Sequence, residues 1–141
     1  MEQFSAGGVV FQKQGDKNLI LVCQHSMHHG WVFPKGLIGD HIEGEKKEDT
    51  ALREVEEETG AKGKIIKLLT PVDYWYFFEG EKIHKTVYYF LMEYVSGDIT
   101  KHDLEMEAVQ WLPETEVEER LTYPADRKVW GQARQLLAAG F

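Results

Sequence analysis

Residues 39–61 read GDHIEGEKKEDTALREVEEETGA, and this stretch says more about the fold than any other part of the chain. Three of its glutamates, Glu54, Glu57 and Glu58, stand at i, i+3 and i+4, so a helix places them on one face. Like charges at that spacing oppose helix formation, and a compensating partner is therefore expected. A divalent cation such as Mg²⁺ is the natural candidate, because hard cations prefer carboxylate oxygens.

The same segment also has an apolar side. At about 100° per residue, one helix face collects Ala51, Leu52, Val55 and Thr59. The glutamates occupy the neighbouring face, so we expect a helix over about residues 46–59 that docks its apolar stripe into the core. Its acids would then line the edge of a cleft. Arg53 lies four residues before Glu57, where it can pair with that carboxylate and fix its orientation.

The composition limits the class of protein. The 141 residues are the size of one ordinary domain, and we expect a single domain over residues 1–141. A formal charge of −8 argues against an extended nucleic-acid surface, although a few local cations and a metal can still hold a small phosphorylated ligand. No stretch resembles a signal peptide or a membrane span, so we expect a cytoplasmic protein without a membrane segment. The only cysteine, Cys23, excludes an intrachain disulfide.

The order of predicted elements is mixed. Runs of apolar and β-branched residues predict strands at about residues 4–12, 18–24, 64–69, 72–78, 85–94 and 108–112. Gly60 suits the left-handed residue that follows the central helix, and a second helix is expected over about residues 124–139. The sequence therefore predicts an α/β fold in which helices pack against a sheet.

The spacing of the whole segment is more specific than its helix. Gly39 is followed by five residues and Glu45, then by seven residues and the run Arg53-Glu54-Val55, one residue, Glu57-Glu58, one residue, and Gly60-Ala61. This pattern is the Nudix box, and the chain closely resembles Nudix hydrolases. Further similarity lies in residues 5–10, 31–36, 87–91 and 111–112. The Trp-Val-Phe-Pro-Lys-Gly run at 31–36 and the His-Lys-Thr-Val run at 84–87 look most like the diadenosine polyphosphate hydrolase branch.

The resemblance implies a fold and an activity. The expected fold is an α/β/α sandwich around a central mixed β-sheet, and the expected cofactor is Mg²⁺, for which Mn²⁺ can substitute. The expected reaction is hydrolysis of a nucleoside diphosphate linked to another group, here a dinucleoside polyphosphate such as diadenosine tetra- or hexaphosphate. An oxidised nucleoside triphosphate or ADP-ribose is the alternative substrate. A catalytically silent nucleotide-binding module is a further alternative, but the complete set of box glutamates argues against it.

The resemblance also implies roles for individual residues. Glu54, Glu57 and Glu58 are expected to bind the metal, with Glu54 or Glu57 doubling as the base and Arg53 completing the catalytic set. Glu45 either holds the loop or reaches the metal through water. Glu105, six residues before Trp111, is either a further metal-binding or basic glutamate or an exposed loop acid, with Glu107 as the fallback.

One departure from the family pattern concerns the loop before the helix. Residues 37–43 lengthen the usual connection from Pro-Lys-Gly to the box. In the family pattern one glycine both ends the Pro-Lys-Gly run and begins the box. Here Gly36 ends the run and Gly39 begins the box. Either glycine can offer a backbone carbonyl to the metal. His41 in this loop can contact phosphate or can be an ordinary surface histidine.

The expected substrate contacts lie outside the box. Lys35 and Lys85 can bind phosphate or can be ordinary solvated lysines. The aromatic run at 74–78 alternates across a strand, so one face can stack a purine while the other packs in the core. We assign Tyr74 and Tyr76 to the open face. The small-molecule nucleotide is the only partner expected, and a monomer and a homodimer both remain open.

Overall fold

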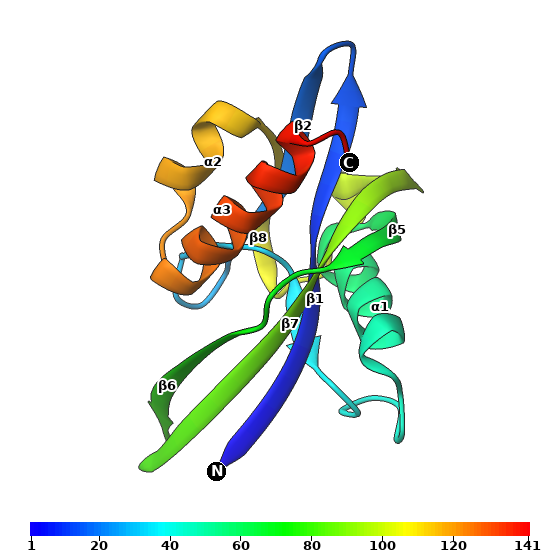
Figure 1. Ribbon diagram of the computed structural model, residues 1–141. Helices are drawn as coiled ribbons and strands as arrows, with labels where there is room; N and C mark the ends of the chain where they lie inside the picture. The colour runs from blue at the N-terminus through cyan, green and yellow to red at the C-terminus, as the bar shows by residue number, and fades with distance from the viewer.

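A mixed sheet of eight strands forms the middle layer of the computed structural model, which describes residues 1–141 (Figure 1). Helix α1 covers one face of this sheet, and helices α2 and α3 cover the other. In chain order the elements are β1 (Glu2–Gln14), β2 (Lys17–His25), β3 (Trp31–Val32), β4 (Lys35–Leu37), α1 (Lys47–Thr59), β5 (Ala61–Leu68), β6 (Val72–Phe78), β7 (Glu81–Gly97), the 3₁₀ turn η1 (Ile99–Lys101), β8 (Met106–Pro113), α2 (Glu114–Arg120) and α3 (Pro124–Ala138). The expected α/β/α sandwich is confirmed.

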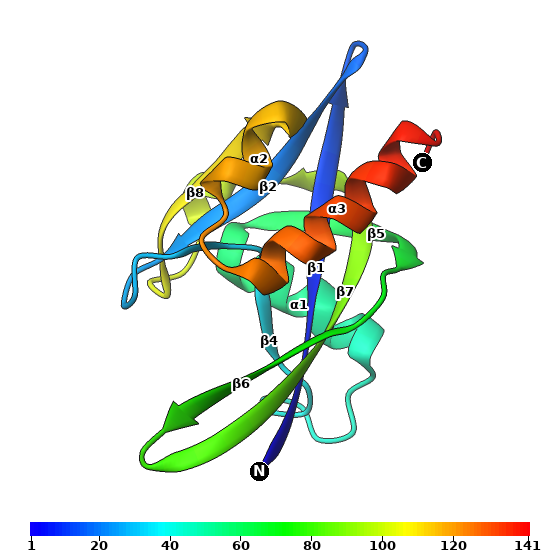
Figure 2. The same cartoon turned by 60° about the vertical axis from the view of Figure 1, so that its left-hand side comes forward.

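Strand β1 is the organising strand of the sheet. It pairs with β7 in parallel and with β2 and β4 in antiparallel fashion. The main strand order is β3-β2-β1-β7-β5, while β6 pairs with β7 and β8 pairs with β2. In Figure 2 the β6–β7 hairpin extends beyond the body of the molecule, and α3 crosses the sheet above it. The sheet is therefore mixed, as predicted.

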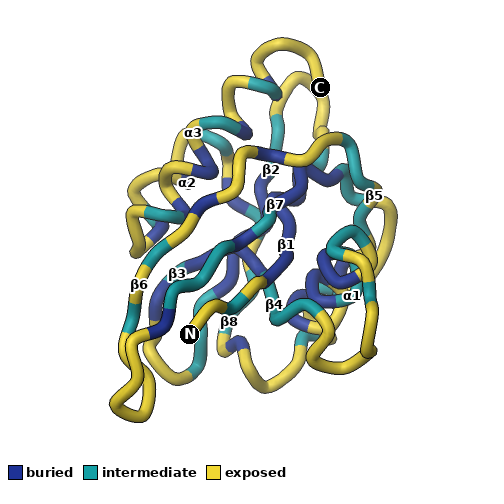
Figure 3. Tube along the Cα trace, turned by 60° about the horizontal axis from the view of Figure 1, so that its bottom comes forward, coloured by how far each residue is buried: buried dark blue, intermediate teal, exposed yellow.

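Two apolar cores lie on the two faces of this sheet. Alternate side chains of β1 point to opposite sides, so Val9 and Phe11 join a cluster of 17 buried residues that includes Trp130 of α3. Ala6 and Val10 instead join a cluster of eight that includes Ala51 and Val55 of α1. Figure 3 shows the buried side of α1 turned toward the strands and its exposed side toward solvent. The apolar stripe predicted for the central helix is thus the surface that docks it.

The sequence predicted most of the elements. Helix α1 ends at Gly60, whose φ of 82° is the left-handed conformation expected there, and α3 begins at Pro124 as expected. Strand β7 is longer than predicted, because its ends continue as ladders with β5 and β6. Strand β4 and helix α2 were missed. Both are too short to display a period: β4 has three residues, and α2 buries Val117 alone.

None of the helices combines the length and the apolar character that crossing a bilayer requires.

Candidate active site

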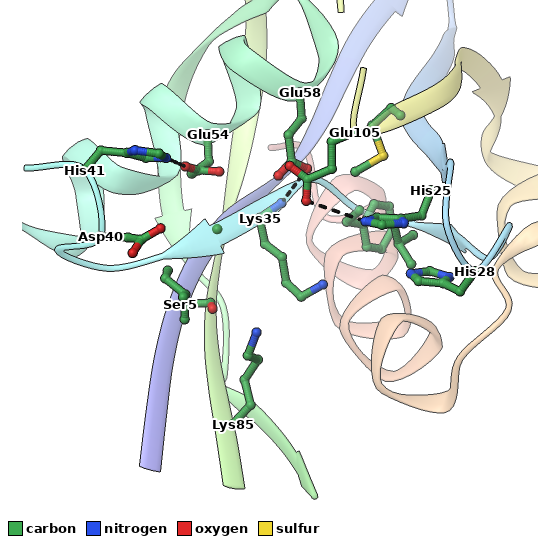
Figure 4. A pocket seen from close by; sticks show the side chains of 15 residues that line it. Ser5, His25, His28, Lys35, Asp40, His41, Glu54, Glu58, Lys85 and Glu105 are labelled. Atoms are coloured by element: carbon green, nitrogen blue, oxygen red, sulfur yellow. Dashed lines mark hydrogen bonds and ion pairs between the residues drawn. The ribbon is translucent and has the colours of Figure 1, made fainter. Parts of the chain in front are cut away.

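A cleft with a volume of about 330 Å³ lies where α1, β4 and the segment before β8 meet (Figure 4). Its lining includes the ionisable side chains of His25, His28, Lys35, Asp40, His41, Glu54, Glu58, Lys85 and Glu105. Figure 4 shows the three glutamates along one side of the cleft and the two lysine side chains extending below them. The cleft therefore holds clustered carboxylates and clustered amines close to each other.

The three box glutamates, which were predicted to line the edge of a cleft, differ in burial. The side chains of Glu54 and Glu57 are 7% and 46% exposed, and Glu58 is 2% exposed as a residue. The cause is the helical turn of about 100° per residue, which sets Glu58 and Glu54 progressively further from the apolar stripe and Glu57 furthest of all. Glu54 and Glu58 consequently line the cleft, while Glu57 lies outside its lining.

Strand β4 fits closely against these carboxylates. The backbone N–H of Lys35 donates a hydrogen bond to Oε1 of Glu58 at 3.3 Å. A Cβ atom at Gly36 would lie 1.9 Å from Oε2 of Glu54, so only glycine fits there without moving the carboxylate. Gly39, with φ of 79°, has no heavy atom within 4 Å of the corresponding position and does not line the cleft. Of the two candidate glycines, the structure places Gly36 at the carboxylates.

Arg53 connects the acids of the box into one network. Its Nη1 donates to Oε1 of Glu54 at 2.8 Å and to both oxygens of Glu57 at 3.2 Å. Its Nε and Nη2 donate to the two oxygens of Glu45 at 3.0 and 2.9 Å. Glu45 also accepts a hydrogen bond from the Thr50 hydroxyl at 2.7 Å. The expected Arg53–Glu57 pair is present, and Glu45 ties the preceding loop to the helix.

The buried acids are electrostatically unfavourable on their own. Burial raises the pKa of Glu54, and it raises the pKa of Glu58 well above its ordinary value, with nearby Glu105 adding to the effect. Ligand atoms of Glu54, Glu57 and His41 lie within 4.8 Å of one another. A divalent cation fits this donor set, because it would offset the repulsion between carboxylates and because carboxylate oxygens are hard ligands.

The two lysines of the cleft have opposite pKa shifts. Burial alone would lower the pKa of Lys35, but the negative charges of Asp126 and Glu58, together with Tyr74, raise it above its ordinary value. Burial lowers the pKa of Lys85 to about 8, and the positive charge of Lys35 adds to this effect. Both predicted phosphate contacts therefore reach the cleft, but only Lys85 titrates near neutral pH.

Asp126 is a site residue that the sequence did not reveal. It lies in the first turn of α3, is 6% exposed, and accepts a hydrogen bond from the Phe33 backbone N–H at 3.2 Å and from the Tyr89 hydroxyl at 3.4 Å. Its charge helps to keep Lys35 protonated. An acid in a first helical turn is common because it complements the helix dipole, so nothing in the sequence distinguished this one.

Glu105 enters the cleft and Glu107 does not. Ser26 holds the Glu105 segment in place, because its backbone N–H and its hydroxyl donate to the Glu105 carbonyl at 2.9 and 2.7 Å. Nε2 of His25 lies 3.5 Å from Oε1 of Glu105, whereas Glu107 pairs with His29 outside the cleft.

The stacked rings of His25 and His28, 4.2 Å apart, were also missed as lining residues. The sequence feature that could have indicated these two lining residues is the cluster of histidines at residues 25–29.

The aromatic strand β6 divides its side chains between two faces, and the purine-stacking role of Tyr74 and Tyr76 stays a prediction. Tyr74 and Tyr76 are half-buried and do not line the cleft, while Trp75 and Phe77 are 56% and 74% exposed on the opposite face. Tyr74 packs against the α3-side core, and the Tyr76 hydroxyl donates to Oε1 of Gln3 at 2.6 Å. The tyrosines occupy the sheltered face because β6 extends the sheet surface that α3 covers.

Comparisons with known proteins agree with this geometry. The family model of the NUDIX domain matches residues 1–133. The chain belongs to the Nudix hydrolase family. MutT4 of Mycobacterium tuberculosis is 42% identical over 108 residues, which are 76% of this chain and 42% of that protein. The 8-oxo-(d)GTP phosphatase of Mycolicibacterium smegmatis is 32% identical over 110 residues, 78% of this chain and 32% of that protein.

A solved structure matches over almost the full length. The binary complex of the Caenorhabditis elegans Ap4A hydrolase superposes with a TM-score of 0.72 at 25% identity, covering 99% of each chain. By contrast, this chain spans less than half of the two mycobacterial relatives. Residues 1–133 of this chain thus match a Nudix domain.

Gly36 and Gly39 can be separated by matched alanine variants. In Gly36→Ala the new Cβ must displace the Glu54 carboxylate, so we expect divalent-cation affinity, measured by calorimetry, to fall by about tenfold or more, as it does when the support of a metal ligand is lost. Gly39→Ala should cost about 1 kcal/mol of folding stability through its positive φ and leave cation affinity unchanged. Equal losses of cation affinity in both variants would contradict the placement of Gly36.

The pKa of Lys85 predicts a pH dependence. A lysine is charged below its pKa, so Lys85 loses its charge as the pH rises through about 8. A hydrogen bond to a charged group contributes about 1.5–3 kcal/mol, or roughly tenfold or more in KM. We expect the KM for a nucleotide substrate to rise above pH 8 in the wild type but to stay level in Lys85→Arg, because the guanidinium remains charged. A parallel rise in both proteins would show that another group titrates.

Proposed function

We propose that this chain is a nucleotide pyrophosphohydrolase that depends on a divalent cation and cleaves a dinucleoside polyphosphate. The observation that carries the proposal is the charge distribution of the cleft, in which Glu54, Glu58 and Glu105 lie beside Lys35 and Lys85. The acids supply ligands for a cation, and the lysines supply contacts for phosphate oxygens. A cleft with only one of these sets would suit either a metal or an anion, but not a metal-bound phosphate chain.

The carboxylates divide into two groups by their surroundings. Glu54 and Glu58 are buried against β4 and held in place by Arg53 and by the Lys35 backbone N–H, respectively, which suits metal ligands. Glu57 is more exposed and shares Arg53 with Glu54. Mg²⁺ usually retains several waters and needs only a few protein carboxylates, so these three residues form a sufficient set, and Mn²⁺ can replace it.

The proposed reaction is the attack of water on a phosphorus atom of the phosphate chain. A bond forms between the water oxygen and phosphorus, a bridging P–O bond breaks, and the water proton passes to a carboxylate. Glu105 is well placed to accept it, because its side chain is 52% exposed and lines the cleft. The bound cation would neutralise phosphate charge and stabilise the leaving oxygen. Lys35 and Lys85 would hold the phosphate oxygens in line with the attack.

A long phosphate chain suits this arrangement better than a short one. The two lysines come from different strands and lie below the acids in Figure 4, so they can contact phosphates beyond the one under attack. The match to the C. elegans Ap4A hydrolase over 99% of both chains supports the same substrate class. The 32% identity to an 8-oxo-(d)GTP phosphatase supports a second candidate, an oxidised nucleoside triphosphate.

A substrate panel separates these candidates. The purified protein with Mg²⁺ would be incubated with diadenosine tetraphosphate, diadenosine hexaphosphate, 8-oxo-dGTP, dGTP and ADP-ribose, and the products resolved by chromatography. We expect kcat/KM for a diadenosine polyphosphate to exceed the others by about tenfold or more, a discrimination that a few contacts can supply. A preference for 8-oxo-dGTP over dGTP would favour the second candidate. Binding without any turnover would identify a silent nucleotide-binding module.

Glu57 provides a test of the metal-ligand assignment. Glu57→Gln is nearly isosteric and removes the charge, so we expect kcat to fall by about 10²-fold or more, a loss typical of one catalytic group. Folding should persist, because the exposed ion pair with Arg53 contributes no more than about 1 kcal/mol. Glu56→Gln is the matched control on the same helix, since Glu56 approaches only Lys62, at 3.9 Å. Equal activity of the two variants would rule out the assignment of Glu57.

A further inference from the structure

The lengthened loop brings a histidine to the metal-binding carboxylates. His41 lies between the Pro-Lys-Gly run and Glu45, and its Nε2 is 3.9 Å from Oε1 of Glu54. Ligand atoms of His41, Glu54 and Glu57 all lie within 4.8 Å of one another. In Figure 4 the imidazole lies beside Glu54 and points toward its carboxylate. The loop that departs from the family pattern thus delivers a nitrogen atom to the proposed metal site.

We propose that His41 is a direct nitrogen ligand of the divalent cation and joins the proposed carboxylate ligands, of which Glu54 and Glu57 lie nearest to it. A consequence is that the site binds Mn²⁺ in preference to Mg²⁺. This inference rests on the metal dependence in the proposed function and adds a ligand to it. It also replaces the phosphate contact that the sequence suggested for His41, because an imidazole nitrogen beside the metal-binding carboxylates faces the cation rather than the anion.

The spacing of the three groups is close to that of a coordination shell. Ligand atoms at about 2.0–2.2 Å from a shared ion lie about 3 Å apart when they are neighbours in the shell and about 4.4 Å apart when they are opposite. The 3.9 Å between His41 Nε2 and Glu54 Oε1 therefore has to shorten by about 1 Å for neighbouring ligands. The His41 side chain is 58% exposed, and its loop lies outside both apolar cores, so the imidazole can move by this amount without disturbing the packing of the fold.

Arg53 is the group that a cation must compete with. Its Nη1 now donates to Glu54 and Glu57, two of the carboxylates of the proposed metal site. Its Nε and Nη2 are separately anchored on Glu45. Arg53 can consequently give up the more exposed Glu57 to the cation while Glu45 keeps the guanidinium in position. Arg53 does not compete for the His41 nitrogen, because the guanidinium and the imidazole are both attracted to the carboxylates and not to each other.

The nitrogen donor determines the expected metal preference. Mg²⁺ is a hard ion that takes oxygen ligands in a strict octahedral shell and releases water reluctantly. Mn²⁺ lies in the divalent transition series, in which imidazole is an accepted ligand, and it tolerates carboxylates equally well. A site that combines carboxylates with one imidazole therefore favours Mn²⁺ over Mg²⁺, whereas a site made only of carboxylates, carbonyls and water does not favour Mn²⁺ in this way.

Pulsed electron paramagnetic resonance of Mn²⁺ tests this ligand directly and requires no turnover. We expect the wild-type protein with Mn²⁺ to show the echo modulation of a coordinated ¹⁴N nucleus, and His41→Gln to lack it. His84→Gln is the matched control, since His84 pairs with Glu2 and Asp73 on the β6–β7 hairpin and does not line the cleft. This control should keep the modulation, and thermal melts should show that all three proteins fold.

Calorimetric titration gives the second measurement. Losing the support of a metal ligand already costs about 10–100-fold in affinity, so His41→Gln should weaken Mn²⁺ binding by about tenfold or more and Mg²⁺ binding less. Nitrogen modulation that persists in His41→Gln would overturn the inference and assign the nitrogen to another histidine. Wild-type protein that binds Mn²⁺ without modulation would overturn it while leaving the proposed function intact. Wild-type protein that binds neither ion would refute both.

Discussion

The burial of Glu54 and Glu58 is the constraint on which the rest of the site depends. Two neighbouring carboxylates removed from water are costly unless they are paired and hydrogen-bonded. The protein reduces this cost with the guanidinium of Arg53 on Glu54 and with a backbone N–H on Glu58. Gly36 lets β4 approach closely enough to cover them. The remaining repulsion is balanced when a cation is bound, so helix packing and metal binding are parts of one arrangement.

The sheet brings the opposite charge to the same place. Gly7 of β1 is in register with Lys35 of β4, and Gln3 of β1 is in register with Lys85 of β7. Gln3 and Gly7 are four residues apart on one strand, so both lysines project from the same face. One strand therefore sets the relation between the lysines, and α1, docked on the other face, supplies the acids at the edge. The acids and the lysines are therefore adjacent, but the acids are not all paired with the lysines.

Local patterns in the sequence predicted what depends on local structure. The apolar stripe of α1, the left-handed Gly60 and the spacing of the box glutamates are properties of neighbouring residues, and each was recognisable. Asp126, His25 and the inward face of β6 depend on which distant segments meet. Asp126 matters because the first turn of α3 meets Phe33, just after β3, and Tyr89 in the middle of β7, and no spacing in the sequence encodes that meeting. The close approach of Gly36 to Glu54 likewise depends on the position of β4.

The two halves of the Nudix box are under different physical limits. The helical half is packed against the sheet through Ala51 and Val55 and tied by Arg53 to three acids, so a change there disturbs both the core and the site. The loop half, with His41 and Gly39, is exposed and belongs to neither core. Its length and composition can therefore vary at little cost to the fold. Differences in the chemistry around the metal are thus most easily introduced from this loop, where an added side chain reaches the carboxylates without repacking the domain.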